Sequence, residues 1–273
     1  MSQARVRRVV PLIFGWEHLP KRSSVPLAPP SERDRPMREP IPGVLVETSA
    51  GWVLLDTGVS GALVRDRWLA ERFWGSRPTK IELATAGDPL EDAFTLVGAD
   101  PRQVVAVAIS HLHNDHAGGL RHFAGRVPVH IQRRELEAAL RDPVLSERNA
   151  MFRIDFDDPR IDWRLADGDA EIAPGVTALL TAGHTPGHQS FLVELDGDAG
   201  GGYIFAFDAA DLQENIDQEQ PVTAAFGQPP EITLPPLRRL KAIAAERRYR
   251  LVPGHDPQLW PTFTEELGVP TRR

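Results

Sequence analysis

The chain of 273 residues contains 41% hydrophobic and 25% charged residues, an ordinary composition for a globular protein of one large domain or two small ones. Its net charge of −7 argues against nucleic acid as the main partner, because phosphate binding needs an excess of Lys and Arg. The absence of cysteine excludes disulfides, thiolate metal sites and a cysteine nucleophile.

The N-terminal segment carries Arg5, Arg7 and Arg8 before the apolar run 9–16. This run is short, contains Pro11 and has no small-residue cleavage site after it, so it does not fit a signal peptide. No stretch approaches the length of a membrane span. We therefore expect a core strand here, no membrane partner and a cytoplasmic protein.

Residues 20–42 hold seven prolines and many charges. Proline removes a backbone donor and fixes φ, so this segment is predicted to be an extended loop. A loop of this length inside a compact domain is usually a lid, a partner-binding arm or a disordered segment, and we favour a plain surface arm over a lid.

The next segments predict a hairpin and a helix. Residues 43–58 contain two apolar runs around the turn TSAG, and the second predicted strand ends at Asp56. Residues 61–74 have the pattern of one helix. Its expected buried face carries Leu63, Trp68, Leu69 and Phe73.

A continuous apolar run at 104–110 is typical of a strand buried on both faces. A further strand is predicted over 127–131, followed by a helix over 133–142. Strands and helices that alternate in this way indicate an α/β architecture in which helices cover sheets.

The second half of the chain repeats this scheme. The predicted elements are a strand over 176–182, a hairpin of 191–195 and 203–211 around the turn 196–202, a helix over 235–250, and a last strand and loop over 251–256. The segments 51–58 and 201–210 both run from glycine through an aromatic residue and an apolar strand to aspartate, which indicates two similar halves.

The segment 110–119, SHLHNDHAGG, follows the buried strand and concentrates metal-binding side chains. His111 and His113 point the same way in an extended stretch, whereas the adjacent Asp115 and His116 diverge. The pattern favours metal binding over a solvated polar loop, with one pair on each of two ions. Neutral imidazole and carboxylate suit Zn²⁺, Fe²⁺, Mn²⁺ or Co²⁺.

The motif HLHNDH resembles the HxHxDH motif of the metallo-β-lactamase superfamily. The phrases GHTPGH, FAFDAAD and PGHD resemble the downstream motifs of that superfamily, so the resemblance covers about residues 43–256. It implies an αββα sandwich, two mixed β-sheets flanked by helices, as a single domain over 1–273.

The resemblance also implies a dinuclear centre with seven ligands. The first ion would be held by His111, His113 and His184, the second by Asp115, His116 and His255, and both by a bridging Asp208. The two divalent transition-metal ions, zinc first and Co, Mn or Fe as alternatives, would share a hydroxide that is nucleophilic at neutral pH.

Several further residues lie beside these motifs. Asp56 resembles a family aspartate that supports the ligands by hydrogen bonding, and its alternative role is a turn cap. His188 and Asp256 each neighbour an expected ligand and either support it or occupy a surface turn. The histidines without a partner pattern, which we expect to be structural, are His18, His122 and His130.

Within the superfamily, SHLHNDHAGG, GHTPGHQS and FDAADLQENI are similar to the N-acyl homoserine lactonases. This resemblance implies that the hydroxide attacks the lactone carbonyl while Asp115 shuttles the proton, and that the chain forms a homodimer. Another ester, a thioester or a phosphodiester is an alternative substrate. A metal-binding protein without hydrolase activity is the alternative function.

One residue departs from the lactonase pattern. Where well-known lactonases place a tyrosine three residues after the bridging aspartate, this chain has Asp211. An ionised aspartate cannot donate a hydrogen bond to a substrate carbonyl. Asp211 therefore either supports the site in another way or caps the helix expected at LQENI.

Overall fold

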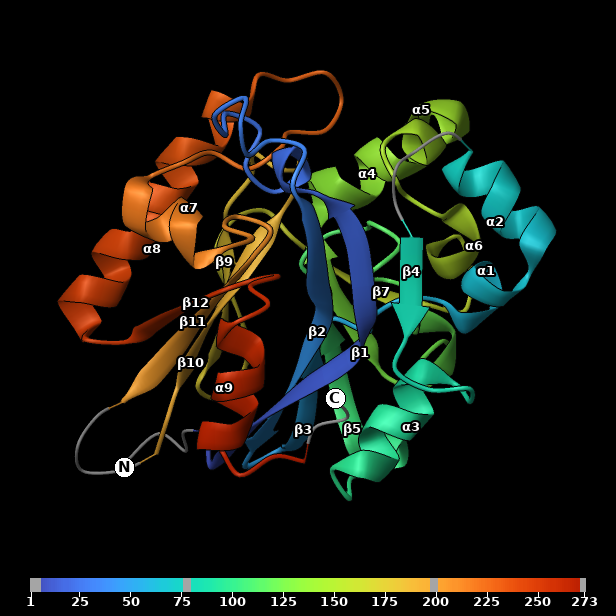
Figure 1. Cartoon of the computed structure of the whole chain (residues 1–273). Helices are drawn as coiled ribbons and strands as arrows, with labels where there is room; N and C mark the ends of the chain where they lie inside the picture. The colour runs from blue at the N-terminus through green and yellow to red at the C-terminus, as the bar shows by residue number, and fades with distance from the viewer. Residues whose placement is uncertain (1–5, 76–79, 197–200, 271–273) are drawn as a thin grey trace.

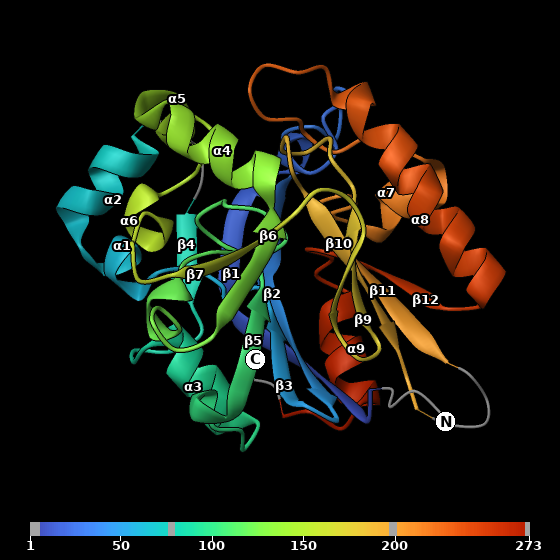
Figure 2. The same cartoon turned by 180° about the vertical axis from the view of Figure 1, so that it is seen from behind.

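The computed structural model describes residues 6–75, 80–196 and 201–270, in which two β-sheets lie face to face between two groups of helices (Figures 1 and 2). Arg5 and part of the predicted turn 196–202 lie outside the described residues. The predicted αββα sandwich is confirmed.

The first sheet has seven strands in the order β4-β1-β2-β3-β5-β6-β7. Strands β1 to β4 pair in antiparallel fashion, and β3, β5, β6 and β7 run parallel. The strands are β1 (Arg8–Pro20), β2 (Pro36–Thr48), β3 (Gly51–Leu55), β4 (Lys80–Leu83), β5 (Val104–Ala108), β6 (Pro128–Gln132) and β7 (Asp162–Ala166).

The second sheet has five strands in the order β12-β11-β10-β9-β8. They are β8 (Ala170–Ala173), β9 (Val176–Leu180), β10 (Gln189–Glu194), β11 (Gly202–Phe207) and β12 (Arg250–Pro253). In both sheets a hairpin is followed by a parallel pairing, β2–β3 with β5 and β10–β11 with β12. The shared order agrees with the sequence similarity between 51–58 and 201–210.

Helices cover both outer faces. Those beside the seven-stranded sheet are α1 (Gly61–Arg65), α2 (Arg67–Trp74), α3 (Pro89–Leu96), α4 (Arg133–Arg141), α5 (Pro143–Arg148) and α6 (Arg153–Phe156). The five-stranded sheet is covered by α7 (Gln213–Gln218) and α8 (Leu234–Arg247), and α9 (Leu259–Glu266) packs at the edge between the sheets (Figure 2). Short 3₁₀ turns lie at Lys21–Ser23, Pro101–Gln103, Leu120–His122 and Pro230–Thr233.

The layers follow from the alternation of side chains along the strands. On β3, Val53 and Leu55 pack in the core between the sheets, while Leu54 packs toward the outer helices. On β10, Phe191 joins the central core and Leu192 packs in the core that includes α8. Because successive side chains of a strand point to opposite faces, a strand that is apolar at every position is buried on both sides.

The loop predicted over 20–42 is wrong for its second part, since β2 begins at Pro36. Its prolines at 36, 40 and 42 occupy alternate positions where β2 pairs with β1 alone, because β3 joins only from Val44. An edge of this kind tolerates missing N–H groups. Residues 21–35 do form a loop, which is fixed to α7 by Lys21 Nζ, 2.7 Å from Glu214 Oε2.

The single helix predicted over 61–74 is also wrong. The chain turns at Asp66, whose side chain accepts hydrogen bonds from the backbone N–H groups of Trp68 and Leu69 and so begins a second helix. Trp68, expected on the buried face, is 82% exposed. The break rotates α2 relative to α1 and removes the shared face that the spacing suggested.

Most other predicted strands and helices lie within a few residues of their expected positions, but three predicted strands end early. The strands expected to reach 110, 182 and 211 end at 108, 180 and 207, and the last strand, expected with its loop over 251–256, ends at 253. The residues after those ends are the loops that carry the histidines and aspartates. In the described part of the chain, no helix combines the length and apolar character needed to cross a lipid bilayer.

Candidate metal centre

The loops that follow β5, β9, β11 and β12 bring seven side chains together, all of them buried except the partly exposed His113. They form two groups whose nitrogen and oxygen atoms lie within 4.8 Å of one another. The first group contains His111, His113, His184 and Asp208, and the second contains Asp115, His116 and His255. All seven residues expected from the sequence are therefore in one place.

Asp208 lies between the two groups. Its Oδ2 atom is 3.3 Å from His184 Nε2 and 3.7 Å from His111 Nε2. Its Oδ1 atom is 3.2 Å from His116 Nε2 and 3.1 Å from His255 Nε2. One carboxylate thus presents an oxygen to each group, which is the arrangement of a bridging ligand.

The far side of the histidine rings is held by fixed acceptors. His184 Nδ1 donates to the carbonyl oxygen of Thr223 at 2.8 Å, and His255 Nδ1 donates to that of Pro40 at 2.8 Å. With Nδ1 held by these acceptors, Nε2 is the nitrogen of each ring that faces the cluster, as in a metal-binding histidine.

Asp56 supports two members of the cluster. Its Oδ2 atom accepts from His116 Nδ1 at 2.7 Å and from Ser110 Oγ at 2.6 Å, and Oδ1 accepts from the Ser110 backbone N–H at 2.6 Å. Ser110 Oγ also lies 3.0 Å from His111 Nδ1. The supporting contact expected for Asp56 is present.

The electrostatics of the cluster favour a cation. Burial disfavours a charge on His116, but Asp115, Asp208 and Asp56 outweigh it and raise the pKa of His116 well above its usual range. The Nε2 atom of the buried His111 has no hydrogen-bond partner among the described residues. Because buried polar atoms rarely stay unpaired, this donor set fits two divalent cations.

The backbone bends sharply at Asp56 and just before Asp208, at the ends of two strands. Asp56 and Phe207, at the ends of β3 and β11, have φ of 57° and 46°, a conformation that costs energy in residues other than glycine. Phe207 directs the chain so that Asp208 enters the cluster. At the end of the HLHNDH loop, a Cβ on Gly118 would lie 2.0 Å from the backbone nitrogen of Ser60, so only glycine fits there.

Glu135 of α4 joins two of the loops and was not predicted. It is fully buried; Oε1 accepts from the Leu112 backbone N–H at 3.1 Å, and Oε2 accepts from that of Gly187 at 2.8 Å. Leu112 lies between two histidines of the first group, and Gly187 lies in the loop that carries His184. In the sequence Glu135 is one of several charges on an amphipathic helix, so no signal distinguishes it.

The other expected residues lie outside the two groups. His188 is buried, with Nδ1 2.9 Å from Thr181 Oγ1 and its ring 5.2 Å from that of His111. Asp256 accepts backbone hydrogen bonds from Gln213, Gln258 and Leu259, so it organises the starts of α7 and α9. Outside the cluster, and near other carboxylates or on β6, are His18, His122 and His130.

The expectation that Asp211 caps the next helix is wrong, because the cap position of α7 is Leu212. Asp211 is 5% exposed, and its Oδ1 atom has no hydrogen-bond partner among the described residues. Burial, followed by the negative charge of Asp208, raises the pKa of Asp211 well above its usual range.

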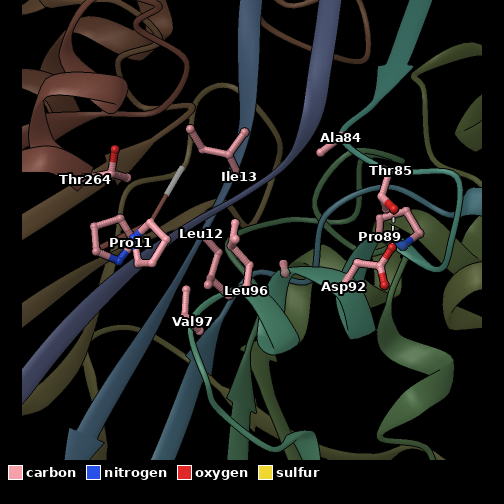
Figure 3. Close-up of a pocket in the computed structure, with 12 residues that line it drawn as sticks. Pro11, Leu12, Ile13, Ala84, Thr85, Pro89, Asp92, Leu96, Val97 and Thr264 are labelled. Carbon is pink, nitrogen blue, oxygen red and sulfur yellow. Dashed lines mark hydrogen bonds between the residues drawn. The ribbon is translucent and has the colours of Figure 1, made fainter. Parts of the chain in front are cut away.

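A cavity of about 180 Å³ opens onto the cluster. A water molecule needs roughly 10–15 Å³ on this scale, so the cavity has room for a small ring. Ser23 and Ser24 of the loop 21–35 line it, so that loop is part of the wall and not a plain surface arm. A second hollow between β1 and α3 measures about 20 Å³ and is mainly apolar, so it lacks room for a substrate (Figure 3).

Two acidic residues of the cavity wall were also missed. Glu17 on β1 and Glu39 on β2 line the cavity together with Asp211. Burial raises the pKa of Glu39 to about 7, although His255 lowers it. An acidic residue inside an apolar strand is the available signal, but it does not reveal which distant loop the side chain faces.

Comparison with known proteins agrees with this geometry. Residues 38–255 match the model of the metallo-beta-lactamase superfamily. The chain is 32% identical over 212 residues to an N-acyl homoserine lactonase of Bacillus thuringiensis, which covers 78% of this chain and 79% of that one. It is 32% identical over 240 residues to the N-acyl homoserine lactonase AttM of Azorhizobium caulinodans, covering 84% and 86%.

A solved structure shows the same fold. An N-acyl homoserine lactone hydrolase with the product N-hexanoyl-L-homoserine bound at its catalytic metal center superposes with a TM-score of 0.80 and 29% sequence identity. The match covers 94% of this chain and 96% of that chain.

Proposed function

This chain belongs to the metallo-beta-lactamase superfamily and, within it, to the N-acyl homoserine lactonases, and from that membership we propose that it hydrolyses the lactone ring of N-acyl homoserine lactones. The observation that carries the proposal is the position of Asp208, whose two oxygens face two separate groups of metal-binding side chains. A carboxylate in this position can bridge the two metal ions of a dinuclear centre.

We propose that the first group holds one divalent cation, the second group holds another, and Asp208 bridges them. Zinc suits these histidine and carboxylate ligands, and cobalt, manganese or iron would fit the same donors. Such ions, when bound, polarise a carbonyl oxygen and make a water nucleophilic at neutral pH.

The residues of the chain supply position and proton transfer. Burial opposes ionisation of Asp115, but His116 outweighs it and lowers the pKa of Asp115 to about 2, so the carboxylate is ionised at neutral pH. It lines the cavity, where it can accept the proton of the attacking water and return it to the ring oxygen that leaves. Asp56 and Glu135 keep the ligand loops in place.

The test is a substrate panel with protein supplied with zinc, cobalt or manganese. Acyl-homoserine lactones, simple lactones, a thioester and a phosphodiester are compared by the acid that hydrolysis releases. We expect the acyl-homoserine lactones to be opened fastest, and Asp208→Asn to lose turnover and metal. The matched control Asp217→Asn removes an exposed carboxylate of α7 and keeps both. Faster hydrolysis of the thioester or phosphodiester would refute the proposed lactone substrate. Full metal content without any turnover would refute the proposal that the protein is a hydrolase.

A further inference from the structure

Asn114 lies in the middle of the HLHNDH loop, between one member of each metal-binding group. His113 precedes it and belongs to the first group, and Asp115 follows it and belongs to the second. Asn114 belongs to neither group, but it lines the cavity that opens onto both. A side chain at this position meets the part of a ligand that lies beside the reacting atoms.

The backbone of Asn114 is held in place, but its side chain does not build the loop. The backbone N–H donates to the carbonyl oxygen of Ala150 at 3.0 Å. An asparagine side chain in a turn commonly accepts the backbone N–H two residues later. Here that N–H, of His116, donates to the carbonyl oxygen of His113 at 3.1 Å instead. The loop therefore keeps its shape without the side-chain amide.

The side-chain oxygen of Asn114 has no donor in the protein. Asn114 is 3% exposed, and its Oδ1 atom has no hydrogen-bond partner among the described residues. Because buried polar atoms are nearly always paired, an orphaned acceptor in a cavity wall needs an explanation. A ligand that brings a hydrogen-bond donor into the cavity would satisfy this oxygen.

The proposed substrate carries such a donor at the required place. In an N-acyl homoserine lactone the amide nitrogen is attached to the carbon beside the ring carbonyl, two bonds from the carbon that water attacks. When the ring carbonyl lies at the metal centre, the amide N–H therefore lies close to the metal-binding side chains. Its acceptor must line the same cavity and flank those side chains, as Asn114 does.

An amide also suits this position better than a carboxylate. An ionised carboxylate between two members of the cluster would be a further metal ligand, and it would add a negative charge beside the attacking water. The neutral amide oxygen accepts a hydrogen bond without that charge. Asn114 can therefore bind the substrate while the seven proposed ligands keep the ions.

We propose that Asn114 Oδ1 accepts the amide N–H of N-acyl homoserine lactones and is a specificity-determining residue for them. The inference rests on the proposed lactonase function, and it adds the residue that distinguishes an N-acylamino lactone from a lactone without this N–H. A site built to hydrogen-bond an N–H group rejects an analogue that lacks it, because the acceptor then stays buried and unpaired. The ring-opening step itself is unchanged.

The experiment compares two neutral lactones with the zinc-loaded protein. One is N-butanoyl homoserine lactone, and the other is its carba analogue, in which CH₂ replaces the N–H and only the ring ester can be hydrolysed. Each kcat/KM is divided by the rate of alkaline hydrolysis of the same lactone, which corrects for intrinsic reactivity. We expect the wild type to prefer the N–H lactone by about tenfold or more.

The variant Asn114→Leu replaces the amide with an apolar side chain of similar size, so its preference for the N–H lactone should fall to about one. A general loss of structure lowers both rates together and leaves their ratio unchanged. Asn114→Ala gives the same test if the leucine variant does not fold. The matched control Gln103→Leu removes an exposed side-chain amide before the start of β5, outside the cavity, and should keep the wild-type ratio.

Two results would overturn the inference in different ways. If the wild type opens the corrected carba analogue as fast as the N–H lactone, or if the Asn114 variants keep the wild-type ratio, the role of Asn114 is refuted and the lactonase proposal stands. If neither lactone is opened, the lactonase proposal fails and this inference fails with it.

Discussion

Replacement of Glu135 by glutamine tests how the chain positions its metal-binding loops. In Glu135→Gln one oxygen still accepts a backbone N–H, but the amide NH₂ faces the other N–H and leaves it unpaired in a fully buried position. An unsatisfied buried donor costs about 1–3 kcal/mol. For a chain of this size each kcal/mol corresponds to about 2–4 °C in Tm.

The same change loosens both loops that Glu135 connects, those of Leu112 and Gly187. Loss of a residue that supports metal ligands weakens metal affinity by about 10–100-fold. We therefore expect a lower Tm and weaker zinc binding, measured by thermal unfolding of the metal-free protein and by competition with a chelator. The matched control is Glu137→Gln, an exposed position on the same helix. Zinc affinity and Tm equal to those of the control would refute the positioning role.

Three further predictions follow from buried groups. Burial raises the pKa of Asp155 to about 8, although Arg121 lowers it, whereas an unfolded aspartate has a pKa of about 3.9. Between these two pKa values the folded state holds a proton that the unfolded state has lost, so the free energy of unfolding falls by about 1.4 kcal/mol per pH unit as the pH rises. Urea unfolding at several pH values should show this dependence in the wild type and not in Asp155→Asn. The same pH dependence in the variant would contradict the prediction. The pKa values of His116 and His255 are raised, so zinc must displace protons from these side chains when it binds. Calorimetry in buffers of different ionisation enthalpy should show this proton release, and zinc affinity should rise with pH. Zinc binding without proton release would argue against these two ligands. Gly118→Ala should destabilise the fold by about 1–3 kcal/mol, because the added Cβ would clash with the backbone at Ser60. The control Gly201→Ala, whose added Cβ has its nearest atom at 3.9 Å, should not destabilise it. Equal free energies of unfolding for the two variants would refute the close packing at Gly118.

The resemblance in the sequence predicted the αββα fold, and the seven candidate ligands that it named lie together in the structure. They could be named because they sit in short motifs directly after apolar strands. Asp208 is the clearest case. A resemblance supplied its bridging role, and the structure gives the distances to both groups. Short motifs of this kind can be recognised in the sequence without knowing how distant segments pack.

What the sequence could not predict depends on contacts between distant segments. Glu135 and Leu112 are 23 residues apart, and Glu135 and Gly187 are 52 apart. Neither distance leaves a periodic signal. The break at Asp66 was missed because its capping hydrogen bonds compete with a helix that the apolar spacing favours equally well.

The position of the acidic residues in the cavity wall also depends on tertiary structure. Glu17 and Glu39 lie on paired strands of the first sheet, and they face Asp211 only because the hairpin of β1 and β2 extends over the loops of the second sheet. Strand alternation shows which face of a sheet a side chain occupies, but not which loop lies opposite.

The most direct test of the dinuclear lactonase is a titration of metal-free protein with zinc, followed by the rate of N-acyl homoserine lactone opening at each step. We predict that binding saturates at two zinc ions per chain and that full turnover needs the second ion, because Asp208 faces both groups. Saturation at one ion per chain, or full turnover of the metal-free protein, would contradict the account.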